Sequence, residues 1–208
     1  MIYERTYRAE FFYKSMKFLS FNNILGDYLE FGCCGGMTFA LAFRQSRLRG
    51  LNVHLYGFDS FQGLPIPVGV DVHEQWREGD MCHHLEDYRK HLRRQGLNDT
   101  DYTLVPGFYV DTLTEQTRKK LGLTRVALVY VDCDLYESTV SVLDFVLPLL
   151  QTGTILAFDD WYCFNGDPER GEQLALKEFR QKHSEIGFVD YQNFGWHGRS
   201  FIVKKHHR

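Results

Sequence analysis

The sequence is short of the features that mark specialised classes of protein. No apolar run among its 208 residues is long enough to cross a membrane, and the first residues contain no hydrophobic segment of a signal peptide. No linker rich in proline, glycine or serine divides the chain, and no segment repeats. The sequence also has no large excess of positive or negative charge, since the formal net charge is −3. The single basic run, 204–208, is expected to be a solvated tail. We therefore expect one globular domain, without a membrane or nucleic acid as its partner.

Cysteine is scarce as well. The five cysteines are an odd number and include no Cys-x-x-Cys pair, which argues against a disulfide framework and against a cysteine-rich zinc site. The adjacent Cys33 and Cys34 are expected to be small packing residues, because the sequence shows no partner base for them. We accordingly expect the protein in a reducing cytoplasm.

Two kinds of segment alternate along the chain. Short apolar runs predict strands at 28–31, 53–58, 102–105, 126–131 and 154–158. Helical patterns follow them at 37–49, 83–95, 111–121, 137–150 and 171–183. This order predicts an α/β fold with a Rossmann-like, doubly wound and mostly parallel sheet, which ends in an antiparallel strand pair at 188–189 and 200–203.

We place residues 26–208 in this α/β domain. The preceding segment, 1–25, carries five aromatic side chains within its first 13 residues: Tyr3, Tyr7, Phe11, Phe12 and Tyr13. We expect it to form a lid or an oligomer contact, so a homo-oligomer is compatible with the sequence. Packing on the core is an equal alternative for this segment.

A glycine-rich turn, from Glu30 to Thr38, joins the first predicted strand to the first predicted helix. Glycines let the backbone turn tightly and approach a ligand. Their spacing matches neither the dinucleotide fingerprint nor the phosphate-binding loop, which disfavours a nucleoside triphosphatase. A bare strand–helix turn is one alternative. Glu30 favours S-adenosylmethionine, because a carboxylate can pair with the ammonium group of that ligand.

Asp59 stands at the carboxyl end of the second predicted strand. A carboxylate at this position accepts the hydrogens of a ribose diol in nucleoside-binding α/β folds. It would serve NAD as well as S-adenosylmethionine, and a purely structural capping role is also open. Asp59 therefore indicates a nucleoside ligand without selecting which one.

Further aspartates follow the fourth and fifth predicted strands, namely Asp132, Asp134, Asp159 and Asp160. If these strands are neighbours, Asp132, Asp159 and Asp160 meet at one rim of the sheet. Without a cation they would repel one another, whereas three oxygen donors suit Mg²⁺ or another hard divalent ion. Such an ion would activate a hydroxyl group, and Asp134 could then take its proton. Helix capping is the alternative, above all for Asp134.

These segments resemble the macrocin O-methyltransferase (TylF-type) family over roughly residues 26–183. The resemblance rests on four motifs: Glu30-Phe31-Gly32, the block 56–65 (Tyr-Gly-Phe-Asp-Ser-Phe-x-Gly-Leu-Pro), the block 131–139 (Val-Asp-Cys-Asp-Leu-Tyr-Glu-Ser-Thr), and Asp159-Asp160 followed by Gly171-Glu172-Gln173. It implies a class I methyltransferase that uses S-adenosylmethionine and Mg²⁺ to methylate hydroxyls, typically on sugars of natural products.

The resemblance also implies roles for single residues. Asp132, Asp159 and Asp160 would coordinate the metal, and Glu30, Gly32 and Asp59 would line the cofactor site. To the cofactor site we further assign Gly36, Thr38, Ser60, Gly107 and Asp132. Asp134 matches the general base of the aminocoumarin branch, whereas Tyr162 stands where the macrolide branch has a histidine.

The sequence thus predicts a metal-assisted O-methyltransferase whose acceptor is a small hydroxylated molecule, such as a sugar or another ring of a natural product. The loops 63–80, 161–171 and 193–199 are expected to shape the acceptor pocket, with Trp76, Trp161, Tyr162 and Trp196 as aromatic walls and His197 as a substrate contact. Two alternatives remain. One is a nicotinamide-dependent oxidoreductase, and the other is a non-catalytic ligand-binding protein that retains the fold.

Overall fold

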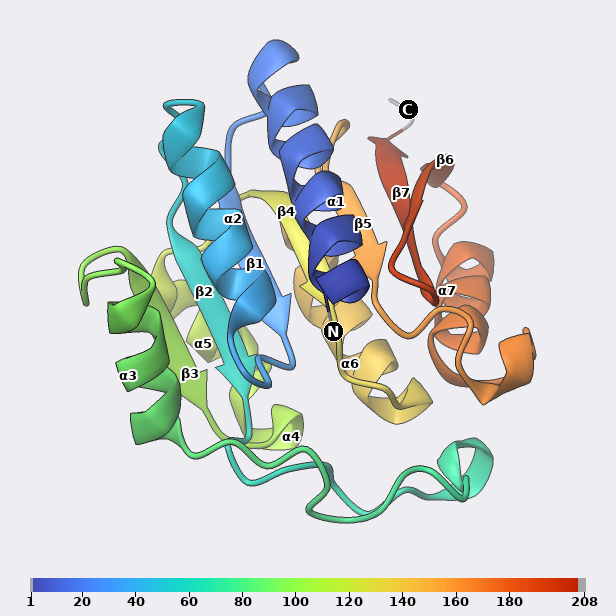
Figure 1. The fold of residues 1–208 in the computed structure, drawn as a ribbon. Coiled ribbons are helices and arrows are strands. Elements are labelled where there is room, and N and C mark those ends of the chain that lie inside the picture. Colours follow the sequence, from blue (N-terminus) through green and yellow to red (C-terminus); the bar gives the residue numbers. More distant parts are fainter. Residues whose placement is uncertain (1, 206–208) are drawn as a thin grey trace.

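The longest apolar runs of the sequence form the centre of a seven-stranded sheet (Figure 1). The computed structural model describes residues 2–205, so residue 1 and residues 206–208, the end of the basic run, lie outside the described residues. The parallel strands are β1 (Asp27–Phe31), β2 (Leu55–Asp59), β3 (Tyr102–Pro106), β4 (Val126–Val131) and β5 (Ile155–Phe158). The sheet has the order β3-β2-β1-β4-β5-β7-β6.

The sheet ends in the predicted antiparallel pair. β7 (Gly198–Lys205) runs antiparallel to β5 and to β6 (Ile186–Phe194). Both strands are longer than the sequence suggested, because polar residues continue a hairpin whose outer strand is partly exposed. Lys204 and Lys205, which we expected in a solvated tail, belong to β7. The Rossmann-like fold class is confirmed.

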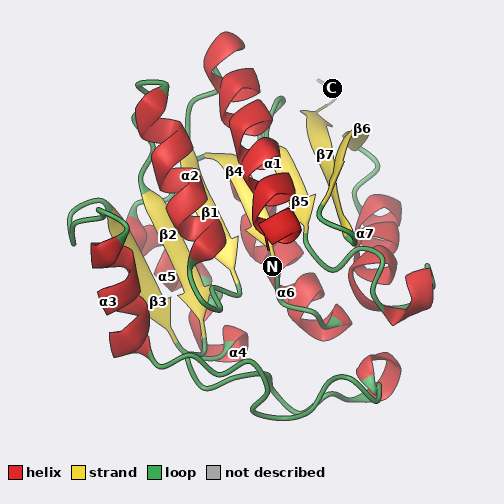
Figure 2. Cartoon of the chain, viewed as in Figure 1, coloured by secondary structure: helices red, strands yellow, loops and turns green. Residues whose placement is uncertain are grey.

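Helices cover both faces of the sheet (Figure 2). One face carries α1 (Ile2–Phe21), α2 (Met37–Leu48) and α3 (Leu85–Arg94). The other carries α5 (Glu115–Leu121), α6 (Tyr136–Val146) and α7 (Gly171–Lys182). The short helix α4 (Tyr109–Thr112) and three 3-10 turns complete the set, η1 (Gly69–Asp71), η2 (Leu147–Leu149) and η3 (Phe164–Gly166).

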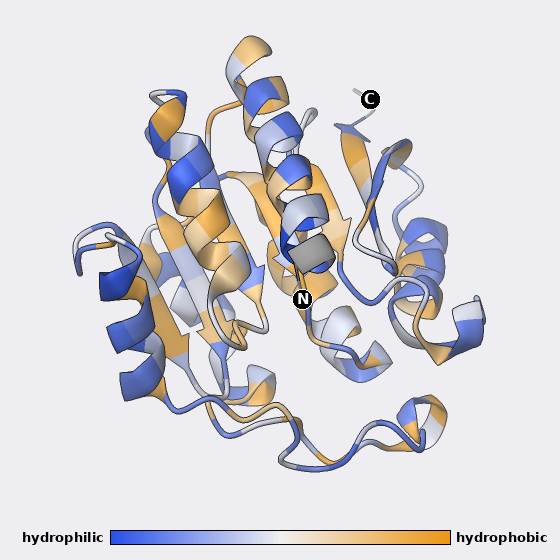
Figure 3. Ribbon diagram, viewed as in Figure 1, coloured by the Kyte–Doolittle hydropathy of each residue, from blue (hydrophilic) through white to orange (hydrophobic). Residues whose placement is uncertain are grey.

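Side-chain alternation along the strands divides the core into two layers. In β4, Leu128 and Tyr130 pack towards α1 and α2, whereas Val129 and Val131 pack towards α6 and α7. Successive side chains of a strand point to opposite faces, so a strand that is covered on both faces must be apolar throughout. Figure 3 shows this as mostly hydrophobic central strands, flanked by helices in which hydrophobic and hydrophilic residues are mixed.

Two predicted helices differ from the structure. The segment 111–121 is divided, because the Thr114 hydroxyl accepts a hydrogen bond from the Thr117 amide and begins α5 there. The helix expected to end at residue 150 instead ends at Val146 and continues as η2, which contains Pro148.

The N-terminal segment forms a long helix that packs on the sheet. The side chains of Phe11, Phe12, Met16 and Leu19 are at most 1% exposed and belong to the same core layer as Tyr28 and Tyr130. This is core packing, the alternative that the sequence left open for these side chains. Among the described residues, no helix combines the length and the apolarity that a membrane span requires.

Candidate active site

The carboxyl ends of the parallel strands open into one cavity of about 900 Å³. It lies where the strand order reverses, between β1 and β4, which is the usual position of ligands in doubly wound sheets. The predicted site residues that line it are Gly32, Gly36, Thr38, Asp59, Ser60, Asp132, Asp134, Asp159 and Asp160. Glu30 and Gly107 are not among the lining residues.

Gly32 allows the ends of β1 and β4 to approach closely. Its φ is +84°, and a Cβ at this position would lie 1.6 Å from the carbonyl oxygen of Asp132. Only glycine fits such a position. Gly36 then precedes α2 with φ 75°, and no side chain caps the helix. The first amides of α2 are therefore available to a ligand in the cavity.

Glu30 lies beneath the cavity wall rather than in it. Its carboxyl group is fully buried and accepts hydrogen bonds from the hydroxyls of Tyr28 and, at 2.9 Å, of Thr38. Burial raises the pKa of Glu30 to about 8. Because Thr38 lines the cavity, Glu30 reaches that space only through the Thr38 hydroxyl.

Asp59 fastens the glycine turn to the end of β2. Its carboxylate accepts hydrogen bonds of 2.6 Å from the amides of both Cys33 and Phe61. The Ser60 hydroxyl donates to the Gly63 carbonyl at 2.8 Å. Gly107 lies behind Asp59 and outside the cavity lining, and its amide donates to the Asp59 carbonyl at 2.9 Å.

The aspartates at the ends of β4 and β5 do come together. Asp132, Asp159 and Asp160 each offer a carboxylate oxygen, and these three oxygens lie within 4.8 Å of one another. Burial and the neighbouring carboxylates raise the pKa of Asp132 and of Asp134 well above its ordinary value. Burial and the charge of Asp159 raise the pKa of Asp160 to about 6. These shifts show that the carboxylates repel one another and lack enough positive charge nearby to balance them.

Arg8, a residue that we did not predict, reaches this cluster from α1. Its Nε donates to Asp159 Oδ1 at 3.1 Å and its Nη2 to Asp159 Oδ2 at 2.6 Å. Burial alone would lower the pKa of Arg8, but the ion pair with Asp159 outweighs burial and raises it. The Tyr130 hydroxyl donates to the same carboxylate. A sequence signal did exist, because helical spacing places Arg8 on the face of α1 that also carries Phe11, Phe12 and Ser15.

Glu172, at the start of α7, adds a further acid. It is 1% exposed, and neither carboxyl oxygen has a hydrogen-bond partner. Burial raises the pKa of Glu172 well above its ordinary value, and the charges of Asp160 and Asp159 raise it further. The sequence contains Glu172 only as part of a family motif, and an acid in the first turn of a helix is ordinarily a surface residue.

The donor set fits a hard divalent cation. Several carboxyl groups surround one end of the cavity, Arg8 supplies a single positive charge, and the buried Oδ2 atom of Asp160 has no hydrogen-bond partner. Unpartnered buried carboxylate oxygens need a positive charge or a donor nearby. Clusters of oxygen ligands are what Mg²⁺ prefers.

Helix capping does not account for Asp134. The carboxylate that caps α6 belongs to Asp71 in η1, which accepts hydrogen bonds from the amides of Tyr136 at 2.6 Å and Glu137 at 3.1 Å. Asp134 has a left-handed φ of 60°, is 4% exposed and lines the cavity. Its side chain is thus left for chemistry in the cavity rather than for the helix.

The predicted aromatic walls are partly present. Trp76 and Trp196 line the cavity, together with Leu64, Pro65 and Ile66 of the predicted loop 63–80. Trp161 instead packs in the core against Phe158 and Phe201. Tyr162 is not a lining residue.

His197 lies in the hairpin between β6 and β7 and also lines the cavity. It is 8% exposed, and its Nδ1 contacts the carbonyl oxygen of Asp159. The same nitrogen is 3.9 Å from Asp160 Oδ1. The substrate contact that we expected for His197 therefore stays a prediction, beside a contact with the carboxylates that the sequence did not indicate.

Comparison with known proteins supplies relatives for this site. The model of the macrocin-O-methyltransferase (TylF) family matches residues 5–197. The 8-demethyl-8-(2,3-dimethoxy-alpha-L-rhamnosyl)-tetracenomycin-C 4'-O-methyltransferase of Streptomyces olivaceus is 31% identical over 148 residues, covering 67% of this chain and 54% of that protein. The mycinamicin III 3''-O-methyltransferase of Micromonospora griseorubida is 28% identical over 189 residues, covering 84% of this chain and 69% of that protein.

The chain spans 54% to 69% of the length of these curated relatives. Among solved structures, the O-methyltransferase NovP is 24% identical with a TM-score of 0.76, and the match covers 94% of this chain and 78% of that one. This likeness shows that the fold is shared. Because the family match extends over most of the sequence, the chain belongs to the macrocin-O-methyltransferase (TylF) family.

Proposed function

We propose that the chain is an S-adenosylmethionine-dependent, divalent-metal-assisted O-methyltransferase that acts on a hydroxyl of a small molecule. The observation that carries the proposal is the meeting of Asp132, Asp159 and Asp160 in one cavity, in a chain of this family. Neither an oxidoreductase nor a simple binding protein requires such a cluster.

Asp132, Asp159 and Asp160 would hold the ion, Mg²⁺ or another hard divalent cation. When bound, such an ion lowers the pKa of an alcohol and fixes its orientation. The support lies in the charge of the cluster, because burial and mutual repulsion raise the pKa of Asp132 and of Asp160. The ion pair between Arg8 and Asp159 keeps one of the three carboxylates in a fixed orientation.

The glycine turn, Thr38 and Asp59 would bind S-adenosylmethionine, which supplies the methyl group. Each oxygen of the Asp59 carboxylate accepts one amide hydrogen bond and keeps a lone pair for a ribose hydroxyl. The uncapped N-terminus of α2 suits the carboxylate of the methionine part. Glu30 would act on the cofactor through the Thr38 hydroxyl that it binds.

Asp134 would take the proton of the acceptor hydroxyl. S-adenosylmethionine would supply the methyl group to the hydroxyl oxygen, and the Asp134 carboxylate would accept the proton that this oxygen loses. Burial and the charge of Asp160 raise the pKa of Asp134, which makes its ionised form a stronger base. Its position in the wall of the cavity supports this role.

The acceptor that we infer is a sugar hydroxyl of a natural product. The name of the tetracenomycin relative specifies a rhamnosyl-bearing substrate and a 4'-hydroxyl. The cavity of about 900 Å³ is at the large end of ligand pockets, which suits a cofactor together with an acceptor. Trp76 and Trp196 supply aromatic faces in its wall.

We also place the protein in the cytoplasm, which the five free cysteines support, and we keep a homo-oligomer as a prediction.

Calorimetric titration with S-adenosylhomocysteine and a methylation assay test the proposal. The assay uses S-adenosylmethionine, Mg²⁺ and a panel of rhamnosylated natural products, with methyl gain read by mass spectrometry. We expect Asp132→Ala to abolish metal-stimulated turnover, whereas the same change at the exposed Asp111 leaves it unchanged. Undiminished metal-dependent turnover in Asp132→Ala would contradict the proposed role of Asp132 as a metal ligand. Absence of S-adenosylhomocysteine binding would contradict the proposed methyltransferase activity.

A further inference from the structure

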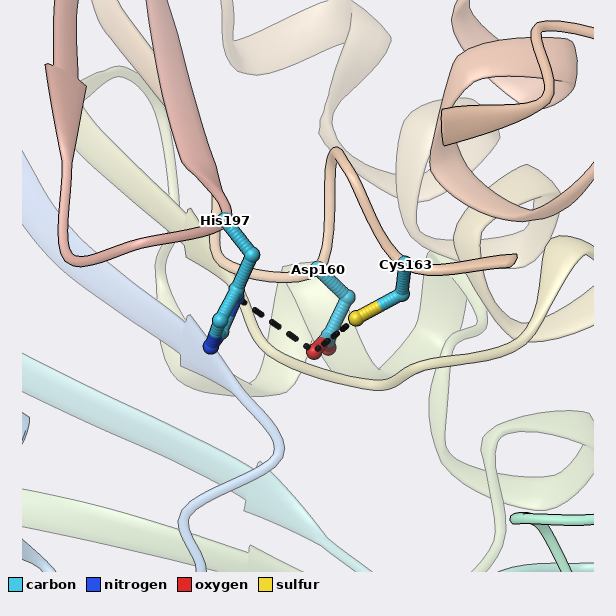
Figure 4. A group of neighbouring side chains, drawn as sticks. All are labelled: Asp160, Cys163 and His197. Atoms are coloured by element: carbon cyan, nitrogen blue, oxygen red, sulfur yellow. Dashed lines mark hydrogen bonds and ion pairs between the residues drawn. The ribbon is translucent and has the colours of Figure 1, made fainter. Parts of the chain in front are cut away.

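Three side chains of different chemistry meet beside the carboxylate cluster. Figure 4 shows Asp160, Cys163 and His197 directed toward one another. The Cys163 Sγ lies 3.5 Å from Asp160 Oδ1, and the His197 Nδ1 lies 3.9 Å from the same oxygen. One donor atom from each residue falls within 4.8 Å of the others. The proposed methyl transfer uses neither Cys163 nor His197.

We propose that Asp160, Cys163 and His197 form a second metal site, which binds a four-coordinate ion of the zinc class such as Zn²⁺ or Co²⁺. Bonds of about 2.3 Å to sulfur and about 2.1 Å to nitrogen or oxygen place neighbouring tetrahedral ligands about 3.4–3.6 Å apart. The observed distances of 3.5 and 3.9 Å are close to this spacing. A mixed set of sulfur, nitrogen and oxygen favours zinc-class ions over Mg²⁺.

The three ligands are held in place before an ion binds. The Cys163 amide donates to the Asp160 carbonyl at 2.9 Å, which closes the turn after β5. The Tyr162 amide donates to the His197 carbonyl at 3.0 Å, which ties this turn to the hairpin between β6 and β7. Ligands on fixed elements bind an ion without first having to be ordered.

The Asp160 carboxylate has a free oxygen in addition to Oδ1, which Cys163 and His197 approach. Asp160 is 7% exposed, and Oδ2 has no hydrogen-bond partner although it is buried. Such an oxygen needs a compensating group. All three residues line the cavity, so the fourth coordination position is open to water or to an oxygen of a substrate.

Binding replaces existing hydrogen bonds of Cys163 and His197 and releases one proton. The Arg8 Nη2 lies 3.5 Å from the His197 Nε2, and since arginine only donates, the ring proton is on Nδ1, where it faces the Asp159 carbonyl. Ligation through Nδ1 moves that proton to Nε2, so the His197 ring gives up both its hydrogen bond to the Asp159 carbonyl and its contact with Arg8. Cys163 binds as a thiolate and passes its proton to solvent.

The two sites share Asp160 but can be separated experimentally. Asp132 belongs only to the carboxylate cluster, and Cys163 and His197 belong only to the second site. Cys34 offers a matched control. Its Sγ lies 3.4 Å from the His83 Nε2, so it also neighbours a histidine, but this pair is exposed.

Co²⁺ is the probe. The full chain is stripped of metal and titrated with Co²⁺ in excess Mg²⁺, and the near-ultraviolet thiolate-to-Co²⁺ band and the visible d–d bands are recorded. We expect both, with the intensity of a four-coordinate ion, in the natural chain, in Asp132→Asn and in Cys34→Ser. Cys163→Ser should lose the thiolate band, and His197→Gln should keep that band but shift the d–d bands.

Several results would overturn the proposal. Two concern the thiolate band of the second site: its absence in the natural chain, or its persistence in Cys163→Ser. The other two are d–d bands that His197→Gln leaves unchanged, and loss of the thiolate band in Asp132→Asn. Far-ultraviolet circular dichroism tests whether each variant is folded. If Cys163→Ser does not fold, the d–d bands of His197→Gln decide the assignment. None of these readouts depends on methyl transfer, so they stand apart from the outcome of the methylation assay.

Discussion

The guanidinium group of Arg8 holds both oxygens of the Asp159 carboxylate, although 151 positions of sequence separate the two residues. Their side chains are only 10% and 5% exposed. Through this ion pair α1 is fastened to the carboxylates at the ends of β4 and β5. The N-terminal helix therefore supplies a part of the site and not only a cover for the sheet.

Arg8→Met should destabilise the metal-free protein by about 3–5 kcal/mol, because it leaves the buried Asp159 without its cation. Added Mg²⁺ should then stabilise the variant more than the natural chain, since the ion replaces the lost positive charge. Urea denaturation with and without Mg²⁺ measures both effects. The same substitution at Arg5, exposed on the same helix, should change stability by less than about 0.5 kcal/mol. Equal Mg²⁺ stabilisation of Arg8→Met and the natural chain would show that Arg8 does not neutralise the cluster.

Asp134→Asn should lower kcat by about 10²- to 10⁴-fold, the usual contribution of a general base. Affinity for S-adenosylhomocysteine should stay unchanged, because the neighbouring charges of Asp134 are Asp160 and Asp159, which we assign to the metal and not to the cofactor. Steady-state kinetics and calorimetry separate the two effects. Asp144→Asn, an exposed aspartate on α6, serves as the control. A normal kcat in Asp134→Asn would require another base.

Position after a strand made the carboxylates predictable. Asp132 and Asp159 each follow a buried apolar run, and parallel neighbouring strands must bring such residues to one edge. Arg8 and Asp71 could not be placed in the same way. Their partners, Asp159 and the first amides of α6, lie far away in the sequence, and no local pattern identifies which helix or loop reaches them.

Glu30 shows a different limit of the sequence. Its position before the first glycine indicates a cofactor contact, but in a strand the side-chain direction alternates, and Glu30 points towards Tyr28 and Thr38 rather than into the cavity. Trp161 is a similar case, because the turn after β5 directs it into the core. The residue types indicated which chemistry these side chains could perform. The direction in which each side chain points could be known only from the folded structure.

Glu30 should make the stability of the protein depend on pH. Its pKa is raised to about 8 in the folded state, so its contribution is fully present below the ordinary pKa of a glutamate and is lost as pH rises through about 8. Stability of the natural chain should therefore fall across this window. Glu30→Gln keeps an acceptor for Thr38 and does not titrate, so its unfolding free energy should fall less steeply. Parallel slopes for the two proteins would contradict the assignment.

Gly32→Ala should destabilise the fold by more than about 3 kcal/mol or prevent folding, because the added Cβ meets the backbone of Asp132. Gly50→Ala is the matched control. Its φ of +63° is also left-handed, but no atom lies within 4 Å of the added Cβ, so the change should cost about 1 kcal/mol. Chemical denaturation compares the two. Similar costs would mean that φ alone, and not the approach of β1 to β4, demands the glycine.

The cap that Asp71 forms on α6 should control the loop that walls the cavity. Asp71→Ala removes two hydrogen bonds to the helix, which should cost about 1–2 kcal/mol. It should also speed proteolysis between residues 63 and 84, because the middle of this loop then keeps only the hydrogen bonds of Arg170 to the carbonyls of Val70 and Val72 and the ring contacts of His73 and Trp76 with Phe164. Limited proteolysis with mass spectrometry measures the effect.

Glu74→Ala, at an exposed position of the same loop, provides the control for Asp71→Ala and should be cleaved at the natural rate. Trp76 lines the cavity from this loop, so Asp71→Ala should raise the KM for the acceptor more than it lowers kcat. That split follows from our proposal that this loop contacts the acceptor, because the loop does not carry Asp134, the proposed base. If cleavage and KM were both unchanged, the loop would be held by its other contacts, and the cap would serve α6 alone.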